Sequence, residues 1–578
     1  MSRVPIRLPE YVIEWIKEGT HVRVVEPNNA SDIQVKLNDV GILGYGVVIV
    51  PPGLYMVNKP IYVPSNVALI GMGWGTIIKL ADGVASAAYS GIIRNSNHDV
   101  MDGNVNIIIA YLQVDGNKAN QNFFCIGIDM KGANDSMIIG CYVHDTYADN
   151  LGFWKSPKRC MAIGNLCKAA GPAGTGQNGV FVEGEDVAHP AEDCVVANNI
   201  CIDTGHNGVY LSIAERVTVT GNVCSNNGDE GIQAYKSHNI TIAGNVCYSN
   251  DDHGIFIRDS DEAVVSGNYV RGSGQHGIYV INSSYCSVNG NSCRSNTYAG
   301  IMLDSGVALT VNGNVSSYNG THGIYVYRCQ YSGITCNVCA NNSQTTAGNA
   351  DGIILSDGNS TPYCRYNTVI GNKCFDNQGT PTQRYGIVGV DSEDYNLIVA
   401  NNCYQNQHGS LDIYYTGSND KVAWNIGRYE GQGDIREVWA PVTYGSPGLS
   451  NWDGHPGVTI DASGEYCSVG LTVPEDYKST VSVELLFIAH ETAASQHLSI
   501  TTYWGKVGEQ RNNHSLAGAD RNLGAVTEGQ IHSHDVSDLL SPLEAGDVVG
   551  FFIQYSSVSV DSNVFILGVR FRYQNKDI

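Results

Sequence analysis

The feature that most constrains this chain is a repeat with a constant spacing of 23 residues. An asparagine, followed two positions later by cysteine in most copies, recurs at Asn199, Asn222, Asn245, Asn268, Asn291, Asn314 and Asn337. A glycine followed by an aliphatic residue keeps the same spacing from Gly208 to Gly323. Self-similarity of this kind indicates a solenoid, in which each repeat buries its apolar face only against its neighbours.

The residues after each repeat glycine alternate with a period of two. In Ile255-Phe256-Ile257-Arg258, for example, aliphatic side chains occupy every second position. This is the period of a strand and not of a helix. Pairs of asparagine and glycine are suited to left-handed backbone at the corners between strands. Short strands joined by tight corners, with coils about 4.8 Å apart, form a parallel β-helix. The sequence therefore predicts an all-β protein.

Charge and apolar content exclude several classes of partner. The net charge of −23 disfavours binding to nucleic acid or to an anionic membrane surface. The chain has no run of about 18 apolar residues, so we expect no membrane insertion. The first residues mix charge and proline with apolar residues, and we expect no signal peptide.

The cysteines follow the repeat. Eight of the 17 cysteines fall two residues after a repeat asparagine: Cys167, Cys201, Cys224, Cys247, Cys293, Cys339, Cys374 and Cys403. We interpret them as reduced, inward-facing residues that fill the solenoid core. Disulfides or metal binding are the alternative, but a stacked column lacks the spacing of a zinc site. We expect no metal and no cofactor.

Four segments are predicted along the chain. Residues 1–45 form an N-terminal cap, with an amphipathic segment at 9–18 and a helix around 31–37 that begins at a serine or aspartate. Residues 46–427 form the β-helix, and residues 428–457, rich in glycine and proline, form a linker. Residues 458–578 contain well-separated alternating strands, which predict a β-sandwich of jelly-roll type. Extra residues in the less regular coils predict loops at 169–177, 184–193, 343–350 and 357–365.

The start of the repeat region carries a family resemblance. Val50-Pro51-Pro52-Gly53-Leu54-Tyr55, followed by 63–67 and Gly71-Met72-Gly73, resembles the opening of the pectate-lyase-like right-handed β-helix superfamily, which includes bacteriophage tailspikes and polysaccharide depolymerases. With the repeats, the resemblance covers roughly 45–427. It implies a right-handed β-helix, a place in the virion tail, a bacterial surface polysaccharide as partner, and a homotrimer, with a C-terminal domain that drives trimerisation or contacts glycan. The superfamily holds lyases, hydrolases, epimerases and inert scaffolds, so the reaction stays open.

Aromatic residues recur on the outward side of the predicted strands. Tyr210, Phe256 and Tyr279 lie two residues after a repeat glycine, and Tyr235 lies two residues further along its own strand. Exposed aromatic rings suit the binding of sugar rings. Equally, a trimer interface could cover this face, since large apolar patches mark interfaces.

Carboxylates recur beside this face. Asp229 and Asp252 lie one coil apart, two residues before their repeat glycines, and Glu230 follows Asp229 directly. Repulsion within the pair would raise the pKa of one member, as a general acid requires. Glu183 faces outward about two or three coils away. These four residues are the predicted catalytic groups of a glycoside hydrolase. For any one aspartate, a corner residue before glycine is the alternative.

A lyase or C5-epimerase is the second hypothesis. His253 and Arg258 place a base and a cation on one coil, similar to coils of mannuronan epimerases and alginate lyases. The chain lacks the Asp-Pro-His motif of those epimerases. His253, His276 and His322 share a column, where metal binding competes with plain packing. The C-terminal histidines (His490, His497, His514, His532 and His534) show no metal-binding spacing. The third hypothesis is a non-catalytic adhesin or structural fibre.

Overall fold

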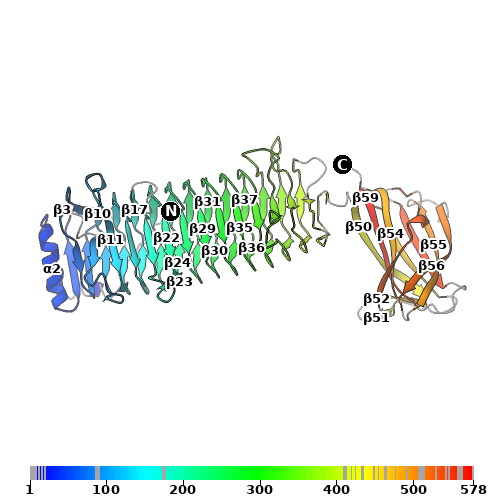
Figure 1. The fold of residues 1–578 in the computed structure, drawn as a ribbon, viewed down its shortest axis with the longest axis horizontal. Helices are drawn as coiled ribbons and strands as arrows, with labels where there is room; N and C mark the ends of the chain where they lie inside the picture. Colours follow the sequence, from blue (N-terminus) through cyan, green and yellow to red (C-terminus); the bar gives the residue numbers. More distant parts are fainter. Residues whose placement is uncertain are drawn as a thin grey trace. The chain divides into compact units, whose positions relative to one another are not determined.

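The chain forms two compact units, Met1–Arg428 and Tyr429–Ile578 (Figure 1). The computed structural model describes residues 10, 13–14, 17, 21–84, 91–171, 177–407, 413–417, 419–423, 425–427, 429–430, 435–446, 450–452, 455–460, 465–474, 477–489, 493–505, 514–526, 530–540, 543–544, 547–555 and 564–575. None of the helices within these ranges is both long and apolar enough to cross a membrane.

The first unit is a parallel β-helix built from three sheets. Sheet A has sixteen strands, from β1 (Val22–Val24) to β48 (Lys421–Ala423), and sheet B has fourteen, from β3 (Gly53–Val57) to β46 (Asn402–Tyr404). Sheet C runs from β4 (Ile61–Val63) to β47 (Ile413–Tyr414). Each strand pairs in parallel with the strand one coil away, and the repeat sets the register. The predicted parallel β-helix is confirmed.

The central coils show how the repeat becomes structure. One coil consists of β24 (Thr218–Thr220) in sheet A, β25 (Val223–Ser225) in sheet B and β26 (Ile232–Tyr235) in sheet C. The next coil repeats them as β27 (Thr241–Ala243), β28 (Val246–Tyr248) and β29 (Ile255–Arg258). Residues 23 positions apart are direct partners, such as Ile232 and Ile255. The middle residue of each short strand points inward.

Cysteine fills the interior of sheet B. The eight cysteines of the repeat are buried and free of disulfide bonds. Cys224 pairs in register with Cys201 and Cys247, and the inner column of thiols is interrupted only where Val270 and Ser316 take the same position. Among the described residues, Cys336 is the one exposed cysteine. The predicted reduced core ladder is confirmed.

The repeat asparagine has a different role from the predicted corner residue. The glycine before it takes the left-handed backbone, with φ between 62° and 66° at Gly221, Gly244 and Gly267. The asparagine itself is buried and stacks on its counterpart in the next coil. The Nδ2 group of Asn222 donates to Oδ1 of Asn245 (3.0 Å) and to the Val196 carbonyl (2.9 Å). The same contacts recur from Asn165 to Asn425, and we call this series the asparagine ladder.

Helix α2 (Ala30–Ile42) covers the first coil. Its buried side chains, Ile33, Leu37 and Val40, close the apolar end of the solenoid. The predicted helix is confirmed, but its predicted N-cap is wrong. Asn29 is the N-cap residue, because its side chain accepts a hydrogen bond from the Asp32 N–H, while Ser31 Oγ donates to Asn29 Oδ1. Most of the segment at 9–18 lies outside the described residues.

The predicted loops are described only in part. Residues 343–350 and 357–365 contain no strand. The segment at 184–193 is a short excursion closed by a bridge between Asp186 and His189 and ending in β19 (Ala191–Glu192). Part of 169–177 lies outside the described residues.

The second unit is an antiparallel sheet system around its own core. Its strands are β50 (Ile435–Ser446), β51 (Ser450–Trp452), β52 (His455–Ile460), β53 (Tyr466–Thr472), β54 (Tyr477–Ala489), β55 (Ala493–Gly505), β56 (His514–Val526), β57 (Ile531–Asp535), β58 (Val548–Tyr555) and β59 (Val564–Asn575). Phe487, Phe551 and Phe571 lie in the buried core. The prediction of antiparallel β structure in this region is confirmed.

The predicted linker at 428–457 is wrong. β50 and β51 fall within it and β52 begins in it, and β50 and β52 both pair with β59. Of the prolines and glycines that suggested a linker, Pro441 and Gly445 lie in β50, and Pro456 and Gly457 lie in β52. Pro441 lies opposite Gly568, and the register shifts between Val442 and Tyr444. A local irregularity of this kind accommodates residues that disfavour regular strands.

Candidate functional site

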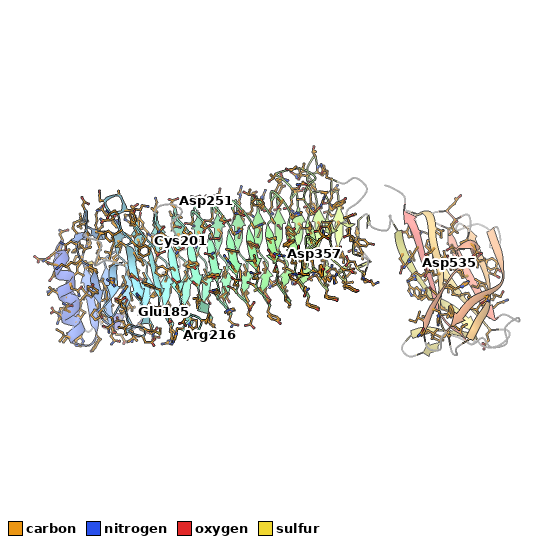
Figure 2. The ribbon with its side chains drawn as sticks, in the orientation of Figure 1. Glu185, Cys201, Arg216, Asp251, Asp357 and Asp535 are labelled. Carbon is orange, nitrogen blue, oxygen red and sulfur yellow. The ribbon has the colours of Figure 1, made fainter. Side chains whose placement is uncertain are left out.

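Three carboxylates meet where the chain enters two neighbouring strands of sheet C. Asp229 and Glu230 precede β26, and Asp252 precedes β29 one coil later. One carboxylate oxygen from each residue lies within 4.8 Å of the others. In Figure 2, Asp251, the residue before Asp252, marks this edge of the coils. The repeat register therefore brings together Asp229, Glu230 and Asp252, which we call the carboxylate cluster.

His206 holds Asp229 from the preceding coil. Its Nε2 atom lies 2.7 Å from Asp229 Oδ2. His206 Nδ1 lies 2.8 Å from the side-chain amide nitrogen of Asn207 and 3.3 Å from Asn178 Oδ1, so two neighbouring side chains hold the ring in place. Burial acts to raise the pKa of Asp229, but the hydrogen bond and charge of His206 outweigh it and hold the pKa below its usual value. Nothing in the sequence alone singles out His206 as the partner of Asp229.

Glu230 is the deepest member of the carboxylate cluster. It is 3% exposed, and among the described residues its Oε2 atom has no hydrogen-bond partner. Burial, followed by the negative charge of Asp229, raises the pKa of Glu230 to about 9. At neutral pH this carboxyl is therefore protonated.

The pKa of Asp252 lies between those of Asp229 and Glu230. Burial, followed by the charge of Asp229, raises its pKa to about 6. Its side chain is 29% exposed, and His253 Nε2 lies 3.5 Å from its Oδ1 atom. The cluster thus combines an ionised carboxylate, a carboxyl that titrates near pH 6 and a buried acid.

A second hydrogen-bond ladder explains the stacked histidines. At four positions just before a repeat glycine (Asn207, His253, His276 and His322), the side chain accepts the backbone N–H of the same position one coil later. His253 Nδ1 accepts from His276 (3.2 Å), His276 Nδ1 from Ala299 (3.1 Å) and His322 Nδ1 from Asp351 (3.0 Å). Burial, followed by the neighbouring ring, lowers the pKa of His253 to about 3 and of His276 to about 4. His253 and His276 are therefore neutral packing groups.

Glu230 occupies the same ladder position as these histidines. Asn207 Oδ1 accepts the Glu230 N–H at 3.1 Å, as the pattern requires. Its own carboxyl lies in the carboxylate cluster instead, with Oε2 unpartnered. An unpaired buried polar atom costs about 1–3 kcal/mol. A departure from a regular stabilising ladder is what a functional site would show.

The predicted aromatic residues line sheet C beside the carboxylate cluster. Phe256 and Tyr279 stack with ring centroids 5.2 Å apart and planes 18° apart, and His253 lies 4.9 Å from Phe256. Tyr210 is in register with Gln233, and Gln233 with Phe256. Arg258 lies over the ring of Tyr235 at 5.4 Å. The rings of Tyr210, Tyr235, Phe256 and Tyr279 are half-buried, so packing restricts their rotation and they form a rigid surface.

Glu183 does not join the carboxylate cluster. It ends β18 (Val180–Glu183) and is in register with Ser212 and, one coil further, Tyr235. Tyr235 lies five residues beyond Glu230, or about 16 Å along the strand. Burial, followed by the charge of Glu185, raises the pKa of Glu183. The expected spacing of two or three coils from the two aspartates is present, but Glu183 lies at the other end of the strand and so is separated from them along the strand as well.

Within the part of the chain that the structure describes, two groups of side chains have the composition of a metal site. The first is the carboxylate cluster. The second consists of Asp115, His144 and Asp145. In the second group, Lys79 Nζ lies 2.6 Å from Asp115, and Gln113 Nε2 lies 2.8 Å from His144 Nε2. Those contacts already engage the ligand atoms.

Glu230 makes a testable contribution to stability. Its folded pKa of about 9 lies above the ordinary 4.5, so the folded chain keeps a proton that the unfolded chain has released. Stability must then fall as pH rises from 4.5 toward 9. We expect Glu230→Gln to raise the unfolding free energy over wild type by about 2 kcal/mol at pH 8.5 and by much less at pH 5. Urea unfolding at the two pH values measures this, and an equal difference at both would contradict it.

Comparisons with known proteins agree with the architecture. Residues 167–315 match the family model described as right handed beta helix region. The repeat region is a right-handed parallel β-helix. Residues 270–435 also match a model described as periplasmic copper-binding protein (NosD). A search of curated proteins gave no match.

Solved structures resemble the chain at low identity. The mannuronan C-5 epimerase AlgE6 A-module of Azotobacter vinelandii is 21% identical, with a TM-score of 0.42, over 70% of this chain and 95% of that one. The Dettilon tailspike protein (gp208) is 12% identical, with a TM-score of 0.42, over 93% and 95%. PfbA, a surface adhesin of Streptococcus pneumoniae, is 13% identical, with a TM-score of 0.42, over 57% and 90%.

Proposed function

We propose that the protein binds a polysaccharide on sheet C and cleaves it by glycoside hydrolysis at the carboxylate cluster. The observation that carries this proposal is the unequal protonation of Asp229 and Asp252 at contact distance, beside half-buried aromatic rings. Hydrolysis of a glycosidic bond needs one protonated and one ionised carboxyl group. Aromatic faces supply the apolar contact that sugar rings require.

The roles follow from exposure and charge. Asp252, with a pKa of about 6 and a partly exposed side chain, is the general acid that protonates the leaving oxygen. Asp229, held ionised by His206, is the nucleophile. Retaining glycosidases place these groups about 5–5.5 Å apart and inverting ones about 6.5–9.5 Å apart. The separation of at most 4.8 Å favours retention. Attack by Asp229 forms a glycosyl ester, and water activated by Asp252 then hydrolyses it.

Glu230 is buried beside Asp229 and Asp252 and supports them without contacting the substrate. At 3% exposure it is too deep to contact a polymer, and its neutral form adds no further negative charge beside Asp229 and Asp252. Phe256, Tyr279, Tyr210 and Tyr235 form the adjoining sugar-binding surface, with Arg258 at its far side.

Substrate and assembly follow from the sequence resemblance. The motif at 50–73 supports a bacteriophage tailspike in the virion tail that recognises a bacterial surface polysaccharide as a homotrimer. In this proposal, the trimer leaves the sugar-binding surface of sheet C exposed.

The lyase or epimerase alternative has less support. It needs His253 as a base, but the Nδ1 atom of His253 accepts a backbone N–H, and burial lowers its pKa to about 3. Arg258 Nε lies 3.4 Å from Asp259 on the exposed side of the strand. His253 is therefore not arranged to remove a proton beside a uronate, and Arg258, the proposed cation, is already paired with Asp259.

The test is product analysis on a panel of purified bacterial capsular and wall polysaccharides. We expect one polymer to shorten, with new reducing ends and no rise in absorbance near 235 nm, the mark of an unsaturated lyase product. Shortening with such a rise would replace hydrolysis by elimination. Retention of a glycan without any shortening would leave a non-catalytic adhesin.

A further inference from the structure

A column of tyrosines lies on the corner between sheets C and A. Tyr285, Tyr331, Tyr366 and Tyr395 each take left-handed backbone with φ between 54° and 60°. Ala308, with φ of 55°, occupies the same position between Tyr285 and Tyr331. The Tyr285 N–H bonds to Val307 and the Ala308 N–H to Gln330, which places the corners of successive coils in register. We call these five residues the corner column.

Where tyrosines occupy neighbouring coils, their rings stack. Tyr331 and Tyr366 have ring centroids 5.1 Å apart and planes 9° apart, and Tyr366 and Tyr395 are 5.4 Å and 28° apart. All four tyrosines are exposed, and Tyr285 and Tyr331, at 66% and 60%, are more so than the other two. These two are the rings that face the position of Ala308.

Ala308 therefore leaves a place for one ring. Tyr285 and Tyr331 lie two coils apart, or about 10 Å at the backbone. A ring inserted midway would lie about 5 Å from each tyrosine, within the 4.5–7 Å range of stacked rings. Val307, 37% exposed, adds an apolar contact beside Ala308.

The geometry points to a binding slot for a single hexopyranose ring between Tyr285 and Tyr331. Because both walls are aromatic, both faces of the sugar must present C–H groups, which selects the β-gluco configuration with its equatorial hydroxyls. Those hydroxyls would then point outward in the ring plane, toward polar side chains at the rim such as Ser284, Thr310 and Gln330, which are half-buried or exposed. This slot lies two or more coils from the carboxylate cluster and does not rest on its activity.

The chain offers a matched pair of variants. Ala308→Tyr fills the slot with a side chain that four neighbours in the corner column already carry in the same backbone conformation, so we expect normal folding. Glu262→Tyr adds a tyrosine at the next position on the other side of Tyr285, with φ of 58°, and leaves the slot open. Both variants introduce the same side chain, and one of them blocks the site.

Saturation-transfer NMR with cellohexaose and β-1,4-mannohexaose tests the slot on the full chain. We expect wild type and Glu262→Tyr to bind cellohexaose, and Ala308→Tyr and Tyr285→Ala to bind it at least about tenfold more weakly. Mannohexaose, with an axial hydroxyl on one face, should bind more weakly than cellohexaose. Absence of cellohexaose binding, equal binding of the two sugars, or undiminished binding by Ala308→Tyr would overturn the proposal. So would a change of oligomeric state in Ala308→Tyr, measured by sedimentation, since a second copy would then occupy the slot.

Discussion

Asp252→Asn is expected to lower the rate of polysaccharide cleavage by about 10³-fold, because an amide cannot supply the proton that the leaving oxygen needs. Wild-type activity should fall as pH rises through about 6, where Asp252 loses that proton. In Asp252→Asn, this fall of activity with rising pH should disappear, together with most of the cleavage rate. Initial rates of reducing-end release between pH 4 and 8 measure both effects. Asp229→Asn should cost at least as much, since it removes the nucleophile.

Two neighbouring carboxylates serve as controls for this prediction. Asp251 is exposed and directly precedes Asp252, so Asp251→Asn changes the same charge without touching the carboxylate cluster. Glu183→Gln tests a carboxylate on the same sheet but at the other end of the strand. Both should retain activity within a factor of about two. A larger loss of activity in Glu183→Gln than in Asp252→Asn would mean that the active site lies at the Glu183 end of the strands of sheet C.

The sequence was sufficient to predict which residues stack, because a constant repeat fixes the register. Asp229 and Asp252 are neighbours for the same reason that Ile232 and Ile255 are partners. The separation of two residues along a strand can also be counted from the sequence. The grouping of Glu183 with Asp229 and Asp252 did not take that separation into account. The repeat cannot show which way a side chain turns. The hydrogen bond from His206 and the unpaired Oε2 atom of Glu230 depend on rotamers and burial, so both emerged only from the structure.

Amino-acid composition led to the wrong prediction at 428–457, because a strand with a local irregularity accommodates proline and glycine there. Pro441 and Gly445 suggested a linker, yet both lie in β50, where Pro441 is opposite β59 and Gly445 is opposite β53. Conversely, the repeat asparagines look like turn residues, since asparagine favours left-handed backbone. Their burial shows that the repeat preserves a hydrogen-bond ladder rather than a corner conformation. The asparagine ladder therefore becomes the feature whose loss should most affect stability.

Asn268 is a central member of that ladder and is 1% exposed. Its Nδ2 group donates to the Ile242 carbonyl and to Asn291 Oδ1, both at 2.9 Å. Its Oδ1 atom accepts the backbone N–H and the side-chain amide of Asn245, at 2.9 and 3.0 Å. Alanine would remove all four contacts and leave buried donors and acceptors on both adjacent coils. Each unsatisfied group costs about 1–3 kcal/mol.

We therefore expect Asn268→Ala to lower the unfolding free energy by about 4 kcal/mol, the largest single-residue effect outside the core. Urea unfolding followed by far-UV circular dichroism measures this. Asn312→Ala, on the exposed side of β36 (Thr310–Asn312), is the matched control and should change stability by less than about 0.5 kcal/mol. Because each coil contacts only its neighbours, the defect should also open the adjacent coils, and amide exchange should accelerate at Asn245 and Asn291 before it does at distant coils. A small loss confined to Asn268 would mean that water replaces the missing amide.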